Sequence, residues 1–337
     1  MRPLIGGLAA SLLLSLPVLA QETGVPLDLP ALAGDIDRLL HAHVYDPEAL
    51  SSPAYERVSE QVEHLAQTAE SRDAFVAGFR DIWRDGPFSH VQLSEAPMPL
   101  DQMITYIDTM RVGGGGAILT WQDDIAVLTV NTMMGQDTIE EIDAAYDTIA
   151  THGARGLIID LRENGGGAFA VKPLVEHVLA EPLEAGAFVS QPWNARMDRA
   201  PGFNDVRSIA PWEGWSVRSF WEHVQTAEIT RIRFVPDAAQ FDGPVYVLTS
   251  ARTASAAEMA ADALKASGRA LLVGETTAGE MLSQTMYELP GNLHLALPIA
   301  DYYSFASGRI EGAGVSPHIA VPAETAMDTA LAALARD

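Results

Sequence analysis

The sequence contains no cysteine among its 337 residues. A disulfide framework, a thiol nucleophile and a cysteine-ligated metal site are therefore all excluded. Basic residues are also scarce, with 21 Lys and Arg against 45 Asp and Glu, which gives a formal net charge of −24. Because such an acidic surface repels nucleic acid and anionic membranes, we exclude both as partners.

Long apolar runs are missing too, apart from one near the amino terminus. Leu4 to Leu16 follows the basic residue Arg2, and small residues precede Gln21, which is the order of a secretory signal peptide over residues 1–20. The run is too short, and too closely followed by polar residues, to span a membrane. We therefore expect an exported protein with no membrane insertion after signal removal. Export without disulfides fits a bacterial periplasm or exterior.

The rest of the sequence divides at Asp85-Gly86-Pro87. Before this break, apolar residues recur at helical spacing from Leu32 to Trp83, in three stretches separated by Pro- or Ser-containing breaks. This pattern predicts an N-terminal helical domain over residues 21–87. Beyond it, short apolar strands alternate with helices, which is typical of an α/β fold. We assign residues 88–337 to this α/β core.

The strands and helices of the core are expected from the spacing of their apolar residues. The expected strands are residues 88–93, 117–121, 125–130, 157–161, 245–248, 270–273, 284–289 and 293–299. The expected helices are residues 138–150, 171–179, 254–266 and 324–336. Residues 245–273 form a strand–helix–strand unit, in which the two strands are normally parallel members of one sheet.

Residues 186–240 interrupt the alternation of strands and helices. They hold four of the six tryptophans, Trp193, Trp212, Trp215 and Trp221. A long irregular segment inside a domain is often functional, and tryptophan supplies a large apolar surface. The sequence leaves two interpretations open, a lid over a cleft or an insertion with a small core of its own.

Ser255 stands where the loop after strand 245–248 becomes the next helix. A hydroxyl is exposed at such a place, and the free N–H groups and positive dipole end of the helix can stabilise an oxyanion. Ser255 is therefore a candidate nucleophile. The alternative is structural, because Ser255-Ala-Ala-Glu258 also has the pattern of a capping box that simply begins the helix.

Two further sites carry residue types that a serine nucleophile needs. His90 is of the right type for a general base, although a single histidine in an alternating stretch can be purely structural. Gly165, Gly166 and Gly167 directly follow a buried strand, so their N–H groups can approach a bound group closely, or they form only a tight turn. No Gly-Lys-Ser/Thr follows them, so a nucleotide site is not expected. We expect no cofactor and no metal.

Together these motifs resemble those of the S41 serine peptidases, which include C-terminal processing proteases, the tricorn protease core and retinoid-binding repeats. The matching motifs are Asp85-Gly-Pro-Phe-Ser-His90, Asp160-Leu-Arg-Glu-Asn-Gly-Gly-Gly167, Thr253-Ala-Ser-Ala-Ala-Glu258, Gly274-Glu-Thr-Thr-Ala-Gly279 and Glu311-Gly-Ala-Gly-Val-Ser-Pro317. The resemblance covers roughly residues 35 to 320, in the family's order. It implies an α/β fold whose core is crotonase-like, of the ClpP/crotonase ββα type, beside an N-terminal helical subdomain.

Two features depart from the tail-specific proteases of that family. There a Lys serves as base 25 residues after the serine, whereas Glu280 occupies this position here. Lys265 cannot replace it, because its place on the same helix puts its Cα about 15 Å from that of Ser255. The tricorn-like branch, which uses Ser, His and Glu, therefore fits better. We also expect no PDZ module, since only 26 residues separate His90 from Ala117.

The resemblance implies hydrolysis of peptide bonds, with peptides or unfolded proteins as substrates. Ser255 would be the nucleophile, and His90 the general base that later protonates the leaving amine. Glu311 would orient His90 directly, or through Ser89 or another hydroxyl. The reaction class is acyl transfer to water.

The resemblance also places an oxyanion hole at the glycine turn. Its donors would be the N–H of Gly165 or Gly166 and the N–H of Ala256. The same fold leaves a second reading open, because the retinoid-binding relatives imply a non-catalytic binding protein for a hydrophobic ligand. An enoyl-CoA-type enzyme shares the ββα architecture, but export and the acidic charge disfavour an anionic thioester substrate. The oligomeric state stays open.

Overall fold

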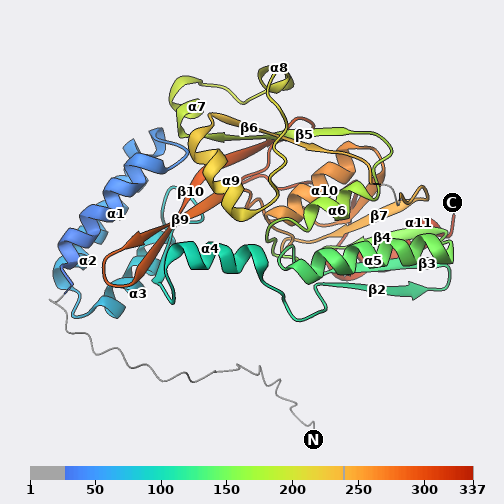
Figure 1. Ribbon diagram of the computed structural model, residues 1–337, viewed down its shortest axis with the longest axis horizontal. Coiled ribbons are helices and arrows are strands. Elements are labelled where there is room, and N and C mark those ends of the chain that lie inside the picture. Colours follow the sequence, from blue (N-terminus) through green and yellow to red (C-terminus); the bar gives the residue numbers. More distant parts are fainter. Residues whose placement is uncertain (1–26, 238–239, 337) are drawn as a thin grey trace, which may run out of the picture.

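A computed structural model of the chain describes residues 27–237 and 240–336. The predicted signal peptide, residues 1–20, lies outside the described residues. No helix in the described ranges is both long and apolar enough to cross a membrane. Figure 1 shows three helices at one end of the molecule and strands with further helices at the other.

The N-terminal part consists of helices α1 (Leu29–His43), α2 (Pro53–Thr68) and α3 (Arg72–Trp83), as the spacing of apolar residues predicted. The helices begin at polar side chains that accept a backbone N–H of the first turn, namely Asp28, Ser52 and Ser71. Phe75 and Phe79 of α3 are fully buried. The buried faces of these helices join the same apolar core as the strands that follow.

The first sheet is antiparallel and has six strands, arranged around the long strand β10. Its members are β1 (Gln92–Glu95), β5 (Leu183–Ser190), β6 (Ile229–Phe234), β9 (Ser283–Leu289), β10 (Leu293–Ser304) and β11 (Gly308–Arg309). Strand β10 pairs with β1, β5, β9 and β11, and β5 pairs with β6. Strand β10 continues to Ser304, whereas the sequence predicted its end at residue 299.

The second sheet also has six strands, in the order β12-β8-β7-β4-β3-β2. Its members are β2 (Ala117–Gln122), β3 (Ile125–Val130), β4 (Gly156–Asp160), β7 (Val245–Thr249), β8 (Ala270–Gly274) and β12 (Ile319–Ala320). Strands β2 and β3 form the predicted hairpin, and the other neighbours are parallel. The predicted strand–helix–strand unit is confirmed, because β7 and β8 pair in parallel on either side of a helix.

Helices cover both faces of the second sheet. They are α5 (Gln136–His152), α6 (Val171–Glu176), α10 (Ala256–Ala266) and α11 (Ala326–Leu334), whereas α4 (Leu100–Thr109) lies apart from this sheet. Successive residues of β4 face opposite sides, so Leu157 and Ile159 belong to the main core whereas Ile158 packs toward α11. In Figure 1, α6 and α10 lie between the strands of the two sheets.

The Trp-rich segment 186–240 begins and ends in the first sheet, because β5 covers its start and β6 lies near its end. Between these strands are three short helices, α7 (Gln191–Arg196), α8 (Phe203–Val206) and α9 (Val217–Thr226). Trp193 and Trp212 are buried. The part of the segment that stands apart from the sheets is therefore limited to the stretch between β5 and β6.

Candidate active site

Ser255 forms a sharp turn between strand β7 and helix α10. Its φ and ψ are 56° and −123°, a left-handed φ that residues other than glycine rarely adopt. Its carbonyl oxygen accepts the N–H groups of Glu258 and Met259 at 2.8 and 3.1 Å. Ser255 therefore begins the helix, as the capping interpretation predicted, and its half-buried side chain also lines a pocket.

The carboxylate of Glu258 holds the backbone of Ser255 and the loop after β8. It is fully buried and accepts the N–H of Ser255 at 3.0 Å. It also accepts the hydroxyl of Thr277 and the N–H groups of Gly279 and Glu280, at 2.5, 2.7 and 2.8 Å. Burial raises the pKa of the Glu258 carboxyl above its ordinary value, and these hydrogen bonds oppose that rise. This single carboxylate therefore joins the start of α10 to the loop after β8.

His90 belongs to a chain of hydrogen bonds that reaches Glu311. The Nδ1 atom of His90 lies 2.6 Å from Oγ of Ser89, and that hydroxyl donates to Oε1 of Glu311 at 2.9 Å. Because the hydroxyl has one hydrogen, Ser89 must accept the Nδ1–H of His90. In the neutral imidazole this leaves Nε2 of His90 without a hydrogen, which is the form that a general base needs.

Glu311 is held in turn by two backbone groups. Its Oε2 atom accepts the N–H groups of Met281 and Leu282 at 2.6 and 3.2 Å. Of the two routes predicted between Glu311 and His90, the described contacts follow the one through Ser89. The backbone amides that hold Glu311 carried no signal in the sequence, since an amide is common to almost every residue.

The segment around His90 corrects one prediction. Residues 88–93 were expected to form a strand, but β1 begins at Gln92. The reason is the φ of His90, which is 66°. An extended strand cannot continue through a left-handed residue, so the chain turns at His90. Ser89 and His90 therefore lie outside the strand pairing of the first sheet.

The glycine turn after β4 packs directly behind Ser255. A Cβ on Gly166 would lie 2.6 Å from Cβ of Ser255, so only glycine fits. The N–H of Gly166 donates to Oδ1 of Asn164 at 2.9 Å, and Nδ2 of the fully buried Asn164 donates to the carbonyl oxygen of Val130 at 2.9 Å. The N–H of Gly166 therefore already has an acceptor. Of the two glycines predicted as alternative oxyanion donors, Gly165 is the one whose N–H is not engaged by Asn164.

One pocket of about 400 Å³ brings the predicted site residues together. Ser255, His90, Gly165 and Ala256 all line it. Ala256 is the first residue of α10, and helix-initial N–H groups lack intrahelical acceptors. Gly165, Ala256 and Ser255 therefore border one space.

The remaining walls of the pocket are mostly apolar and aromatic. They include Phe169, Phe188, Trp212, Trp215, Phe220 and Ile232. The Trp212 ring lies 5.2 Å from that of Trp215 and 5.1 Å from that of Phe220, centroid to centroid. The composition showed that tryptophans are concentrated in segment 186–240. It did not show that Trp212 and Trp215 line the same pocket as Ser255. Glu280 is the one carboxylate among the lining residues.

The lysine considered as a base lies elsewhere. Nζ of Lys265 donates to the carbonyl oxygen of Ser316 at 2.8 Å, and Lys265 does not line the pocket. Within the described ranges, no three His, Cys, Asp or Glu side chains gather in a way that could hold a metal ion. The groups available for chemistry in this pocket therefore include the hydroxyls of Ser255 and Ser283, one imidazole, backbone N–H groups and one carboxylate.

Known proteins resemble this chain in sequence and in structure. The profile of peptidase family S41 matches residues 124–321. A carboxyl-terminal-processing protease of Picosynechococcus sp. is 29% identical over 184 residues, which cover 55% of this chain and 36% of that protein. The match therefore spans about a third of the length of such curated relatives.

Solved structures extend the similarity to most of the fold. A lipoprotein from Streptococcus agalactiae has a TM-score of 0.61 at 14% identity, covering 93% of this chain and 98% of that one. The tricorn protease has a TM-score of 0.59 at 12% identity, covering 92% of this chain and 36% of that one. At these identities the likeness shows a shared mixed α/β fold.

Proposed function

The chain belongs to peptidase family S41, and from that premise we propose that it is a serine peptidase with Ser255 as nucleophile and His90 as general base. The observation that carries the proposal is the hydrogen-bond chain from Glu311 through Ser89 to His90, because it ends in the pocket that Ser255 lines. It leaves Nε2 of His90 free to take a proton. This arrangement supports the Ser/His/Glu chemistry of the tricorn-like branch.

The first half of the proposed reaction acylates the serine. Oγ of Ser255 attacks the carbonyl carbon of the peptide bond while its proton moves to Nε2 of His90. The N–H groups of Gly165 and Ala256 donate to the oxyanion of the tetrahedral intermediate. The C–N bond then breaks, and His90 returns the proton to the leaving amine. Glu311, acting through Ser89, stabilises the imidazolium while it exists.

The second half releases the acyl group. Water attacks the ester carbon as His90 removes a proton from it, and the oxyanion again forms at the same two N–H groups. Collapse of this intermediate breaks the bond to Oγ of Ser255, which regains a proton from His90. The products are a carboxylic acid and the amine released earlier, so one water is consumed for each bond cut.

A lysine base is not part of this proposal. Glu280 lines the pocket at the position where the tail-specific proteases carry Lys, so the amine that serves as their base is missing there. Lys265 is engaged with Ser316 instead. The histidine base is the alternative that the described contacts support.

The pocket supports a substrate class. Its volume of about 400 Å³ and its aromatic walls match a peptide or unfolded protein with large apolar side chains next to the bond that is cut. Trp212, Trp215 and Phe220 come from the stretch between β5 and β6, so this stretch would act as a lid that also sets specificity. Replacing residues 190–222 with a short Gly/Ser linker is then expected to widen the range of peptides cut.

Two further assignments belong to this proposal. The hairpin β2–β3 followed by helix α5 and the parallel strand β4 supports a crotonase-like ββα core. The N-terminal sequence supports export to a bacterial periplasm or exterior, with residues 1–20 removed.

A serine-reactive phosphonate probe tests the proposal against its rival. We expect the probe to label Ser255, and a fluorogenic peptide with an aromatic residue before the cut to be hydrolysed. Ser255→Ala removes the nucleophile and keeps the turn, so labelling and hydrolysis should both vanish while stability changes by about 1 kcal/mol.

The rival is a binding protein for a hydrophobic ligand, which the apolar pocket favours. It predicts no labelling of the wild-type protein and tight binding of an apolar fluorescent dye in this pocket. Hydrolysis by the purified Ser255→Ala protein at the wild-type rate would contradict the assigned nucleophile.

A further inference from the structure

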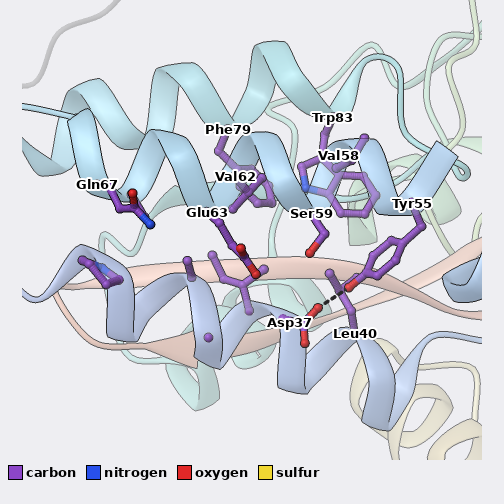
Figure 2. A pocket seen from close by; sticks show the side chains of 15 residues that line it. Asp37, Leu40, Tyr55, Val58, Ser59, Val62, Glu63, Gln67, Phe79 and Trp83 are labelled. Carbon is purple, nitrogen blue, oxygen red and sulfur yellow. Dashed lines mark hydrogen bonds between the residues drawn. The ribbon is translucent and has the colours of Figure 1, made fainter. Parts of the chain in front are cut away.

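A second hollow lies among the N-terminal helices, in a part of the molecule that holds neither Ser255 nor His90. It has a volume of about 260 Å³ and is lined by residues of α1, α2 and α3. Figure 2 shows Ser59, Glu63 and Gln67 of α2 pointing toward the gap above α1. We call this hollow the helix groove. Its position makes it independent of the peptide-bond chemistry proposed above.

The groove is open because α1 carries small residues where it passes α2. Pro30 and Gly34, one turn apart, line its mouth. A Cβ added to Gly34 would meet no atom within 4 Å. Glycine inside a helix is unfavourable compared with alanine, and the φ of Gly34 is not left-handed. The backbone therefore does not require glycine here, and its effect is to leave the space empty.

The bottom of the groove is apolar and contains one polar atom that lacks a partner. Ile36, Leu40, Val62 and Phe79 line the bottom and are buried. Trp83 also lines it and is 6% exposed, and its Nε1–H has no hydrogen-bond partner within the described residues. Buried donors are nearly always paired. A ligand that fits the groove should therefore bring a hydrogen-bond acceptor to Trp83.

The rim of the groove is negatively charged. Asp37 and Glu63 both line it, and no Lys or Arg is among the lining residues. Asp37 accepts the hydroxyl of Tyr55 at 2.5 Å, and its other carboxylate oxygen lies 3.4 Å from Nδ1 of His41. Glu63 is exposed and forms no ion pair within the described residues. A carboxylate beside an apolar hollow favours a ligand with a cationic head and an apolar body.

We propose that the helix groove binds the amino-terminal residue of a peptide when that residue is apolar. The α-ammonium group pairs with Glu63 and Asp37, the apolar side chain enters the hollow, and the first carbonyl oxygen accepts the Nε1–H of Trp83. About 260 Å³ is below the roughly 300–1,000 Å³ of drug-sized ligand pockets, which matches a single residue. The shared chemistry is a compact apolar ammonium with an adjacent carbonyl.

Calorimetric titration of the full chain carrying Ser255→Ala tests this site without any turnover. L-leucinamide and the peptide Leu-Gly-Gly should both bind saturably at one site. N-acetyl-L-leucinamide lacks the ammonium and isoamylamine lacks the carbonyl, so each should bind at least about tenfold more weakly. Binding of leucinamide without binding of the peptide would overturn the assignment to peptide amino termini and indicate a small free amine.

Variants of residues that line the groove, with one matched control outside it, locate the binding. Glu63→Gln should weaken leucinamide binding about tenfold, whereas the matched change Glu60→Gln, one turn earlier on the exposed face of α2, should leave it unchanged. Gly34→Leu fills the mouth of the groove, favours the helix and should abolish binding. Trp83→Phe removes the donor and keeps a ring, so it should weaken binding by a similar factor.

The same titrations define failure. Equal affinities for all four ligands, or unchanged binding in both Gly34→Leu and Glu63→Gln, would overturn the proposal. Neither of these variants requires Trp83 to be replaced, so a folding defect of Trp83→Phe does not affect the decision. Because the readout is binding, loss of the peptidase assignment would leave this result unaffected.

Discussion

The nucleophile and the base of the proposed site are held in different ways. Ser255 starts a helix between parallel strands, and Glu258 alone makes four hydrogen bonds around it. His90 precedes an edge of the antiparallel sheet, and one hydroxyl, that of Ser89, links it to Glu311. The backbone of both residues has a left-handed φ. The nucleophile is thus part of the rigid core, whereas the base depends on a single replaceable link.

Removal of the base gives the largest expected loss. His90→Ala should lower kcat by about 10²–10⁴-fold, the usual contribution of a positioned general base. The phosphonate probe should still label Ser255, but at a lower rate. Steady-state hydrolysis of the aromatic peptide measures this. Glu280→Lys restores the residue type of the tail-specific proteases, and it should not rescue His90→Ala. An unchanged rate in His90→Ala would show that another group is the base.

Replacement of Glu258 tests how firmly the nucleophile is held. Glu258→Gln puts an NH₂ group where the carboxylate accepted N–H and O–H donors, so at least one buried donor loses its acceptor. We expect the free energy of unfolding to fall by about 2–4 kcal/mol, and probe labelling to fall with it. Urea denaturation gives the stability. The matched change Glu311→Gln should cost less stability, because Glu311 is only half-buried. Equal losses of unfolding free energy in Glu258→Gln and Glu311→Gln would contradict the difference between the firmly held Ser255 and the weakly held His90.

The link through Ser89 can be tested with a conservative pair. Ser89→Ala removes the hydroxyl, so kcat/KM should fall by about 10- to 100-fold. Ser89→Thr keeps a hydroxyl and should recover most of that loss. The unfolding free energy should differ little between the two variants. If Ser89→Thr is as impaired as Ser89→Ala, the hydroxyl is not what orients His90.

The smallest effect concerns a buried carboxyl of strand β10, that of Asp301. Oδ2 of Asp301 accepts Nε of Arg309 at 2.5 Å, and burial raises the pKa of Asp301 to about 6. A raised carboxyl pKa adds stability at low pH that is lost as pH rises from about 4 through 6. Asp301→Asn does not titrate. Its unfolding free energy relative to wild type should therefore rise by about 2 kcal/mol between pH 4 and pH 7. A constant difference would show that Asp301 does not titrate in that range.

Much of the fold around Ser255 follows from the sequence because its residues obey local rules. Short apolar runs became β7 and β8, and the Ala-rich stretch between them became α10, each within about two residues of the prediction. The residues of the glycine turn and the Ser255 turn were also identifiable. At the glycine turn the residue type itself indicates the backbone requirement, because only glycine fits at position 166 against Ser255.

The region around His90 was harder to predict for a physical reason. Histidine gives no hint of a left-handed φ, so alternation alone extended the strand to residue 88. The choice of Gly165 over Gly166 depends on the side chain of Asn164, and the route through Ser89 depends on a contact with a distant loop. The direction in which the side chains of Trp212 and Trp215 point depends on how β5 and β6 join the first sheet. Such long-range contacts leave no periodic trace in the sequence.

The hydrogen bond between Ser89 and Glu311 joins positions that are 222 residues apart in sequence. Closing a loop over so long a stretch costs conformational entropy, so this contact depends on the packing of the elements between its two ends. A chain that is still being synthesised, or that has unfolded in part, holds a serine without its oriented base. Under the proposed mechanism, hydrolysis assisted by His90 would therefore require a molecule that has folded far enough to bring Ser89 to Glu311.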